Sequence, residues 1–195
     1  MPTCSGCCRP LSEQPCSQCG VNLPTREDWA NAYAKQSQSD FDIFLLFHDS
    51  DNYALCHAMH YLQMAGEKIA KAYRFRDTAT STNSLLTSHM AFSKFFSSFL
   101  KSNRIKSMYR NRDAQLQIVI KDCKKLAEKV EKLAPAVDRS GAPDNAEYPW
   151  SAGNQIFVPC EYSYPNLTLL KEPSGRTFIQ LLKISIQEFE ELEIA

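Results

Sequence analysis

Four cysteines near the N-terminus are the residues of this sequence with the clearest chemistry. They form two Cys-x2-Cys pairs, Cys4 with Cys7 and Cys16 with Cys19, separated by eight residues. Each pair turns two thiolates toward one point, and four thiolates form the tetrahedral site that zinc accepts. Because four thiolates fill the coordination shell, such a zinc is structural and leaves no position for a substrate. The spacing predicts a zinc ribbon over residues 1–23.

A fifth cysteine, Cys8, follows Cys7 directly and is an alternative ligand. We favour Cys7, because its spacing from Cys4 matches that of the second pair. A spare thiol beside bound thiolates could instead take part in oxidation. The segment resembles the short zinc ribbons at the termini of many prokaryotic proteins, although Cys8 stands where a glycine is usual. The resemblance implies a structural or docking role.

A second group of polar residues lies in the stretch HYLQMAGEKIAKAY, residues 60–73. Spacings of three and four residues place His60, Gln63, Glu67 and Lys71 on one stripe of a predicted helix. An apolar stripe with the same period lies opposite and predicts the core-facing side. Its members are Leu55, Met59, Leu62, Ala65, Ile69 and Tyr73. Periodicity alone leaves two interpretations of the polar stripe, a solvated surface and a site.

Cys56, His57 and His60 suggest a metal site on the same helix, since His57 and His60 share a face. The nearest further ligand, Glu67, lies two turns from His60, about 10 Å by helical rise. We therefore favour side-chain hydrogen bonds within the protein for these residues. Likewise, Glu67 and Lys71 form an i,i+4 pair that stabilises a helix by only a few tenths of a kcal/mol.

Hydrophobic periodicity predicts that residues 24–195 form a mainly α-helical bundle. Thr25 and Asp28 have the spacing of a capping box at the start of the first helix. Residues 135–173 form a proline- and aromatic-rich insertion, with a short strand or hairpin in QIFVPCEYSY that we expect to lie against the bundle. The predicted helices are one of about 20 residues from Thr25, then 52–76, 87–101, 112–134 and 175–192, with the polar stretch TATSTNS as a loop.

Charge is balanced over the whole chain, at 22 basic and 22 acidic residues, but it is unevenly distributed. Residues 78–112 contain no acid, whereas the C-terminal QEFEELEIA contains four acids and no base. Either the two segments neutralise one another in the fold, or the basic one binds an anionic partner. The six cations of the basic segment are Lys94, Lys101, Arg104, Lys106, Arg110 and Arg112.

The N-terminus lacks the apolar core of a secretory signal, which predicts a cytoplasmic protein without disulfides. The longest apolar run, IFLLF at 43–47, is far shorter than the roughly 20 residues that span a bilayer. We therefore expect no membrane association.

The stretch from His60 to Tyr73, followed after a polar loop by Ser88 and His89, resembles the second and third helices of HEPN domains. The resemblance covers residues 26–134. It implies a four- or five-helix bundle, often dimeric, of the kind found in toxin–antitoxin, phage-defence and nucleotidyltransferase-partner systems. Some members of the family are metal-independent ribonucleases.

HEPN ribonucleases carry an arginine followed four to six residues later by a histidine, and this chain lacks that spacing. It has no histidine after His89, and none of its four histidines has an arginine at that distance upstream. We therefore predict a non-catalytic binding or regulatory protein with zinc as its structural cofactor. The alternatives are a divergent ribonuclease, pairing His89 or His60 with Arg110 or Arg112, and a protein-docking scaffold.

The predicted ligand is RNA, a nucleotide or a protein partner, and a homodimer is in keeping with the resemblance. A pocket where the polar stripe meets His89 and the basic segment would suit phosphate. Its candidate residues are His60, Glu67, Lys71, His89, Arg104, Arg110 and Arg112.

Overall fold

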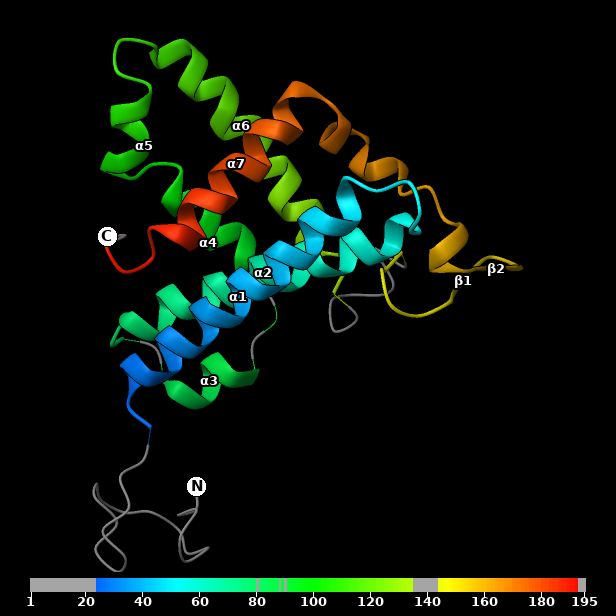
Figure 1. Ribbon diagram of the computed structural model, residues 1–195, viewed down its shortest axis with the longest axis horizontal. Coiled ribbons are helices and arrows are strands. Elements are labelled where there is room, and N and C mark those ends of the chain that lie inside the picture. The colour runs from blue at the N-terminus through cyan, green and yellow to red at the C-terminus, as the bar shows by residue number, and fades with distance from the viewer. Residues whose placement is uncertain (1–23, 80, 88, 90, 135–143, 193–195) are drawn as a thin grey trace, which may run out of the picture.

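The computed structural model describes residues 24–79, 81–87, 89, 91–134 and 144–192. The predicted zinc ribbon, with Cys4, Cys7, Cys16 and Cys19, lies outside the described residues. The described part is mainly α-helical, as predicted (Figure 1). Its helices are α1 (Arg26–His48), α2 (Leu55–Arg76), α3 (Thr82–Thr87), α4 (Phe92–Phe99), α5 (Asn103–Met108), α6 (Asp113–Glu131) and α7 (Pro173–Gln187).

Two long helices, α1 and α2, lie side by side along most of their length (Figure 1). The predicted capping box at the start of α1 is present. The Asp28 amide donates to the Thr25 hydroxyl at 3.1 Å, and the Thr25 amide donates to the Asp28 carboxylate at 2.7 Å. A cap of this kind stabilises a helix by about 1 kcal/mol.

Helix α2 is the central element of the fold. It contacts α1, α3, α4, α6 and α7, so neighbours cover it on more than one side. The predicted apolar stripe is buried from Met59 to Tyr73, which confirms that side of the prediction. The polar stripe is not a solvated surface, however, because Gln63, Glu67 and Lys71 are buried as well.

Glycine at position 66 allows α4 to pack closely on α2. A Cβ atom at Gly66 would lie 2.9 Å from the Phe92 ring. That ring belongs to an aromatic group in which Phe96 and Phe178 also pack edge to face, with ring centres 5.1 Å apart. The core therefore joins α2, α4 and α7.

The segment between α2 and α4 differs from the prediction. Part of the expected loop forms α3, where the Ser84 amide donates to the Ser81 hydroxyl and Leu85 is fully buried. The predicted helix over 87–101 is shorter, from Phe92 to Phe99. A separate helix, α5, follows it because Ser102 caps a new start, accepting from the Ile105 amide.

A hairpin is present before the last helix, but it begins earlier than the predicted stretch QIFVPCEYSY, of which only residues 155–157 are a strand. Strand β1 (Trp150–Ala152) pairs antiparallel with β2 (Gln155–Phe157), with Trp150 opposite Phe157. Gly153 has the positive φ of 61° that this tight turn requires. The 3-10 helices η1 (Pro159–Glu161) and η2 (Pro165–Lys171) then lead into α7.

The aromatic side chains of the predicted insertion (residues 135–173) pack into the protein only in part. Tyr164 is buried, and its hydroxyl donates to the Asn145 carbonyl at 3.0 Å. Tyr148, in contrast, is exposed. The final helix begins and ends earlier than predicted, from Pro173 to Gln187, because proline at the first helical position favours that start.

Candidate functional site

Four polar side chains meet beside α2 in what we call the Glu67 cluster: Gln63, Glu67, Lys71 and His89. One carboxylate oxygen of Glu67, Oε1, lies 3.0 Å from the Lys71 ammonium and 3.0 Å from Nδ1 of His89. The other, Oε2, accepts from the Gln63 amide at 3.0 Å. The sequence-predicted residues Glu67, Lys71 and His89 are therefore brought together by the fold.

Helical periodicity and the docking of α3 together assemble this cluster. Gln63, Glu67 and Lys71 are four residues apart and lie on one stripe of α2. Leu85, on α3, is fully buried, and α3 contacts α2; Nδ1 of His89 lies 3.0 Å from the Glu67 carboxylate. The side chain of His89 is 45% exposed, against 10% for that of Glu67, so the histidine forms the outer edge of the cluster.

The buried charges of the cluster are compensated by one another. A buried carboxylate is costly unless it is paired and hydrogen-bonded, and Glu67 has three partners. The Lys71 ammonium also lies 5.6 Å from the centre of the Tyr33 ring, a cation–π arrangement. The cluster is therefore satisfied without a ligand.

His89 and Glu67 have the geometry of a histidine held by a carboxylate. When the ring is neutral and Nδ1 carries the proton, Nδ1–H donates to Glu67 and Nε2 is an acceptor. A histidine oriented in this way can act as a general base if a substrate reaches Nε2. The pair thus has the geometry of a general base, without a partner among the described residues that would act as the general acid or bind phosphate.

The arginines of the basic segment do not complete that site within the described residues. None of Arg104, Arg110 and Arg112 forms a hydrogen bond or ion pair with the Glu67 cluster. His89 precedes α4, whereas the arginines follow it, and eight helical residues span about 12 Å. Within the described residues, no hydrogen bond or ion pair links these arginines to Lys71 or His89, and their predicted convergence there stays a prediction.

Arg104 instead joins the basic segment to the acidic C-terminal segment. Its Nε and Nη2 atoms donate to the two carboxylate oxygens of Glu188, each at 2.7 Å. These hydrogen bonds lower the pKa of Glu188 and raise the pKa of Arg104. At Arg104, therefore, the acidic C-terminal segment neutralises the basic segment, which is one of the two predicted alternatives.

The other cations of the segment form what we call the basic surface: Lys94, Lys101, Lys106, Arg110 and Arg112. All five are exposed, and none has an ion-pair partner in the part of the chain that the structure describes. They lie along α4, α5 and the start of α6, and α5 with the turn after it forms one end of the molecule (Figure 1). Arg112 is held in place, donating to the Met108 carbonyl at 2.6 Å.

His60 lies apart from the Glu67 cluster, although it belongs to the same predicted stripe. Its Nδ1 atom is 3.1 Å from the Glu147 carboxylate, and its ring packs edge to face on Tyr61. It therefore connects α2 to the segment before β1. Within the described ranges, no group of three or more His, Cys, Asp or Glu side chains is arranged to hold a metal.

A pocket that the sequence analysis did not predict lies between the α1–α2 turn and η2, with a volume of about 500 Å³. His48 and Asp51 line one side, and Lys171 and Arg176 line the other. No sequence signal links these residues, because the two sides are more than 100 positions apart and neither forms a motif.

Among the described helices, none is both long and apolar enough to cross a membrane. Comparisons of this chain with protein-family models, with characterised proteins and with solved structures find no match.

Proposed function

We propose that this chain is a HEPN-like helical module that binds the phosphate groups of RNA without cleaving them, and that it carries a structural zinc ribbon. The observation that carries the proposal is the basic surface, five exposed cations without ion-pair partners among the described residues. Lysine and arginine side chains that neutralise phosphates supply most of the sequence-independent affinity for nucleic acid.

The Glu67 cluster supports the HEPN-like assignment and a structural role for its residues. Three residues of the stretches that carry the resemblance meet in the fold, since Lys71 and His89 both contact Glu67. Since Glu67 has three hydrogen-bond or ion-pair partners and Lys71 is buried, these two residues organise the packing around α2. Binding is then left to residues on the surface.

RNA binding across a salt series tests the proposal. Full-length, zinc-loaded protein is titrated with a fluorescent RNA oligonucleotide at 50 to 300 mM salt, and the same samples are examined by gel for cleavage. We expect affinity that falls steeply with salt and intact RNA. Replacing Arg110 and Arg112 together by glutamine reduces both the affinity and the salt slope. Lys35→Gln, which removes an exposed cation from α1, is the matched control and leaves both unchanged.

Three results would contradict the proposal. RNA binding that the Arg110 and Arg112 substitutions do not change would remove the basic surface from the interaction. Binding that does not depend on salt would argue against phosphate contacts. A failure to bind RNA, together with salt-insensitive binding of a protein partner, would favour a docking scaffold.

One observation favours a second candidate, a divergent ribonuclease. Glu67 holds the half-exposed His89 by Nδ1, as a general base requires. Cleavage of RNA without added metal that is lost in His89→Ala and kept in Cys8→Ser would establish this candidate. Cleavage that persists in His89→Ala would refute it.

Zinc measurement tests the ribbon separately. We expect one zinc ion per chain, lost in Cys7→Ser and kept in Cys8→Ser. The opposite result would assign the fourth ligand to Cys8. Protein that holds no zinc after purification without chelators would refute the ribbon.

A further inference from the structure

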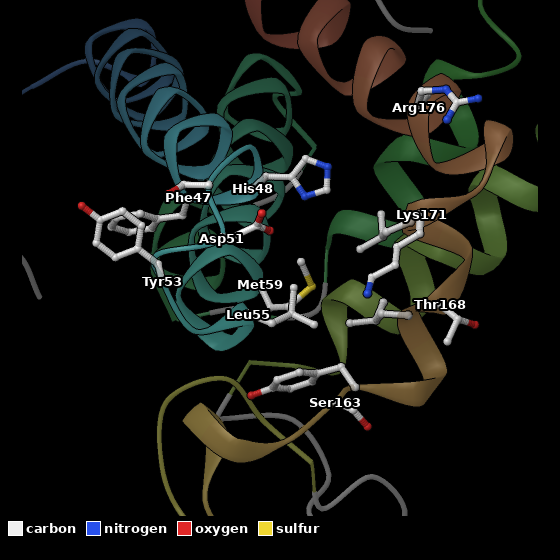
Figure 2. Close-up of a pocket in the computed structure, with 14 residues that line it drawn as sticks. Phe47, His48, Asp51, Tyr53, Leu55, Met59, Ser163, Thr168, Lys171 and Arg176 are labelled. Atoms are coloured by element: carbon white, nitrogen blue, oxygen red, sulfur yellow. The ribbon is translucent and has the colours of Figure 1, made fainter.

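The pocket beside η2 has two facing sides (Figure 2). One side is the end of α1, the turn after it and the start of α2, which carry His48, Asp51 and Leu55. The other is η2 and the first turn of α7, which carry Lys171 and Arg176. Figure 2 shows the Lys171 ammonium pointing into the space between the two sides, with His48 opposite.

The base of the pocket is apolar. Met59, Leu167 and Leu170 line it and are almost fully buried, as is the ring of Tyr164. Its volume of about 500 Å³ lies within the range of pockets that hold small organic molecules, roughly 300 to 1,000 Å³. An apolar base with a few polar groups at the edge is also the usual composition of such sites.

The polar edge of the pocket favours an anion. Lys171 and Arg176 are exposed and have no ion-pair partner in the described part of the chain, and Asp51 is the single carboxylate among the lining residues. The positive charge at this edge comes from the Lys171 and Arg176 side chains and not from backbone amides at the start of α7. The Gly175 and Arg176 amides at the start of α7 already donate to the Glu172 carbonyl, at 2.9 and 3.2 Å.

We propose that this pocket binds a small organic anion, a carboxylate or phosphate joined to an apolar body. Lys171 binds the anionic group, Arg176 assists from the outer edge, and the buried leucines and Met59 contact the apolar body. The site is separate from the basic surface and does not depend on the proposed RNA binding.

Calorimetric titration of the full-length protein with three probes tests this site. Octanoate is a carboxylate with an alkyl chain, and adenosine monophosphate is a phosphate with an aromatic base. Inorganic phosphate has the anionic group without an apolar body. We expect octanoate or adenosine monophosphate to bind more tightly than inorganic phosphate, and the better of the two identifies the source of the anion. Equal affinity for all three probes would refute the role of the apolar base.

Substitutions locate the binding to this pocket. Lys171→Gln is expected to lower the affinity for the tighter-binding probe about tenfold, which is the effect of losing one charge-assisted hydrogen bond. Lys183→Gln, on α7 and outside the pocket lining, is the control and leaves affinity unchanged. Lys171 is exposed, so its substitution preserves the fold, and RNA binding by Lys171→Gln stays at the wild-type level. No binding of any probe, or equal losses in Lys171→Gln and Lys183→Gln, would overturn the proposal.

Discussion

Replacing Glu67 by glutamine removes one charge from a buried ion pair and leaves its shape almost unchanged. In the native protein, the Glu67 carboxylate lies 3.0 Å from the Lys71 ammonium, and the side chains are only 10% and 5% exposed. After the substitution, the Lys71 charge stays buried beside a neutral amide.

The expected loss of stability is about 3 to 5 kcal/mol, the cost of leaving one partner of a buried ion pair uncompensated. This is a large share of the roughly 5 to 15 kcal/mol that stabilise a typical domain. The chain also contains a matched control. Lys124 and Glu128 form an i,i+4 pair 3.9 Å apart on α6, with both side chains half exposed. Glu128→Gln is expected to cost less than about 0.5 kcal/mol.

Urea denaturation followed by circular dichroism measures both variants. Glu67→Leu combined with Lys71→Met removes both charges, and this double variant should recover most of the stability lost in Glu67→Gln. A loss in Glu67→Gln as small as that in Glu128→Gln would refute the argument that the cluster is a desolvated ion pair. A double variant as unstable as Glu67→Gln would show that shape or hydrogen bonding dominates over charge.

Three further predictions concern other residues. Hydrogen bonds from Arg104 lower the pKa of Glu188 below its usual 4.5, so their stabilisation is present above pH 4.5 and is lost as the pH falls through the native pKa. Glu188→Gln should therefore flatten the pH dependence of the free energy of unfolding below pH 5, and an unchanged profile would contradict this. Gly66→Ala should destabilise the protein by about 1 kcal/mol in urea, because strain against Phe92 exceeds the gain in helix propensity, and a stabilised variant would show that the ring moves aside. Burial raises the pKa of the Cys123 thiol to about 12, so peptide mapping after iodoacetamide at pH 8 should find it unmodified in folded protein and modified in urea; equal labelling would mean that the α6 core opens.

Much of the helical framework follows from local sequence signals. The capping box of Thr25 and Asp28 and the apolar stripe of α2 each depend on residues close in the sequence, and the structure contains both features. The polar sequence of helix α3 favours a loop, so local signals do not predict this helix. The burial of Leu85 against the rest of the protein stabilises it, and a tertiary contact of this kind has no local signal.

The site residues show the same limit. Periodicity placed Gln63, Glu67 and Lys71 on one face, but it could not show that other helices cover both faces of α2. The sequence predicts that the polar stripe meets His89, and the side chains of His89 and Glu67 are in contact. The link between Arg104 and Glu188 spans 84 positions, and the pocket at Lys171 has sides still further apart in sequence. Neither could be located from spacing alone.

Buried charged residues of this protein stabilise the fold, whereas exposed ones are accessible to a ligand. Glu67 and Lys71 each have a charged partner inside the protein, so their substitution changes the folded fraction. Arg110 and Arg112 are exposed, and their substitution removes positive charge while the core is unchanged. Under the proposed function, a loss of RNA binding in Glu67→Gln should therefore follow its loss of stability and recover at lower temperature or with a stabilising osmolyte. The loss caused by substituting Arg110 and Arg112 should persist in fully folded protein, because the substitution removes the proposed phosphate contacts.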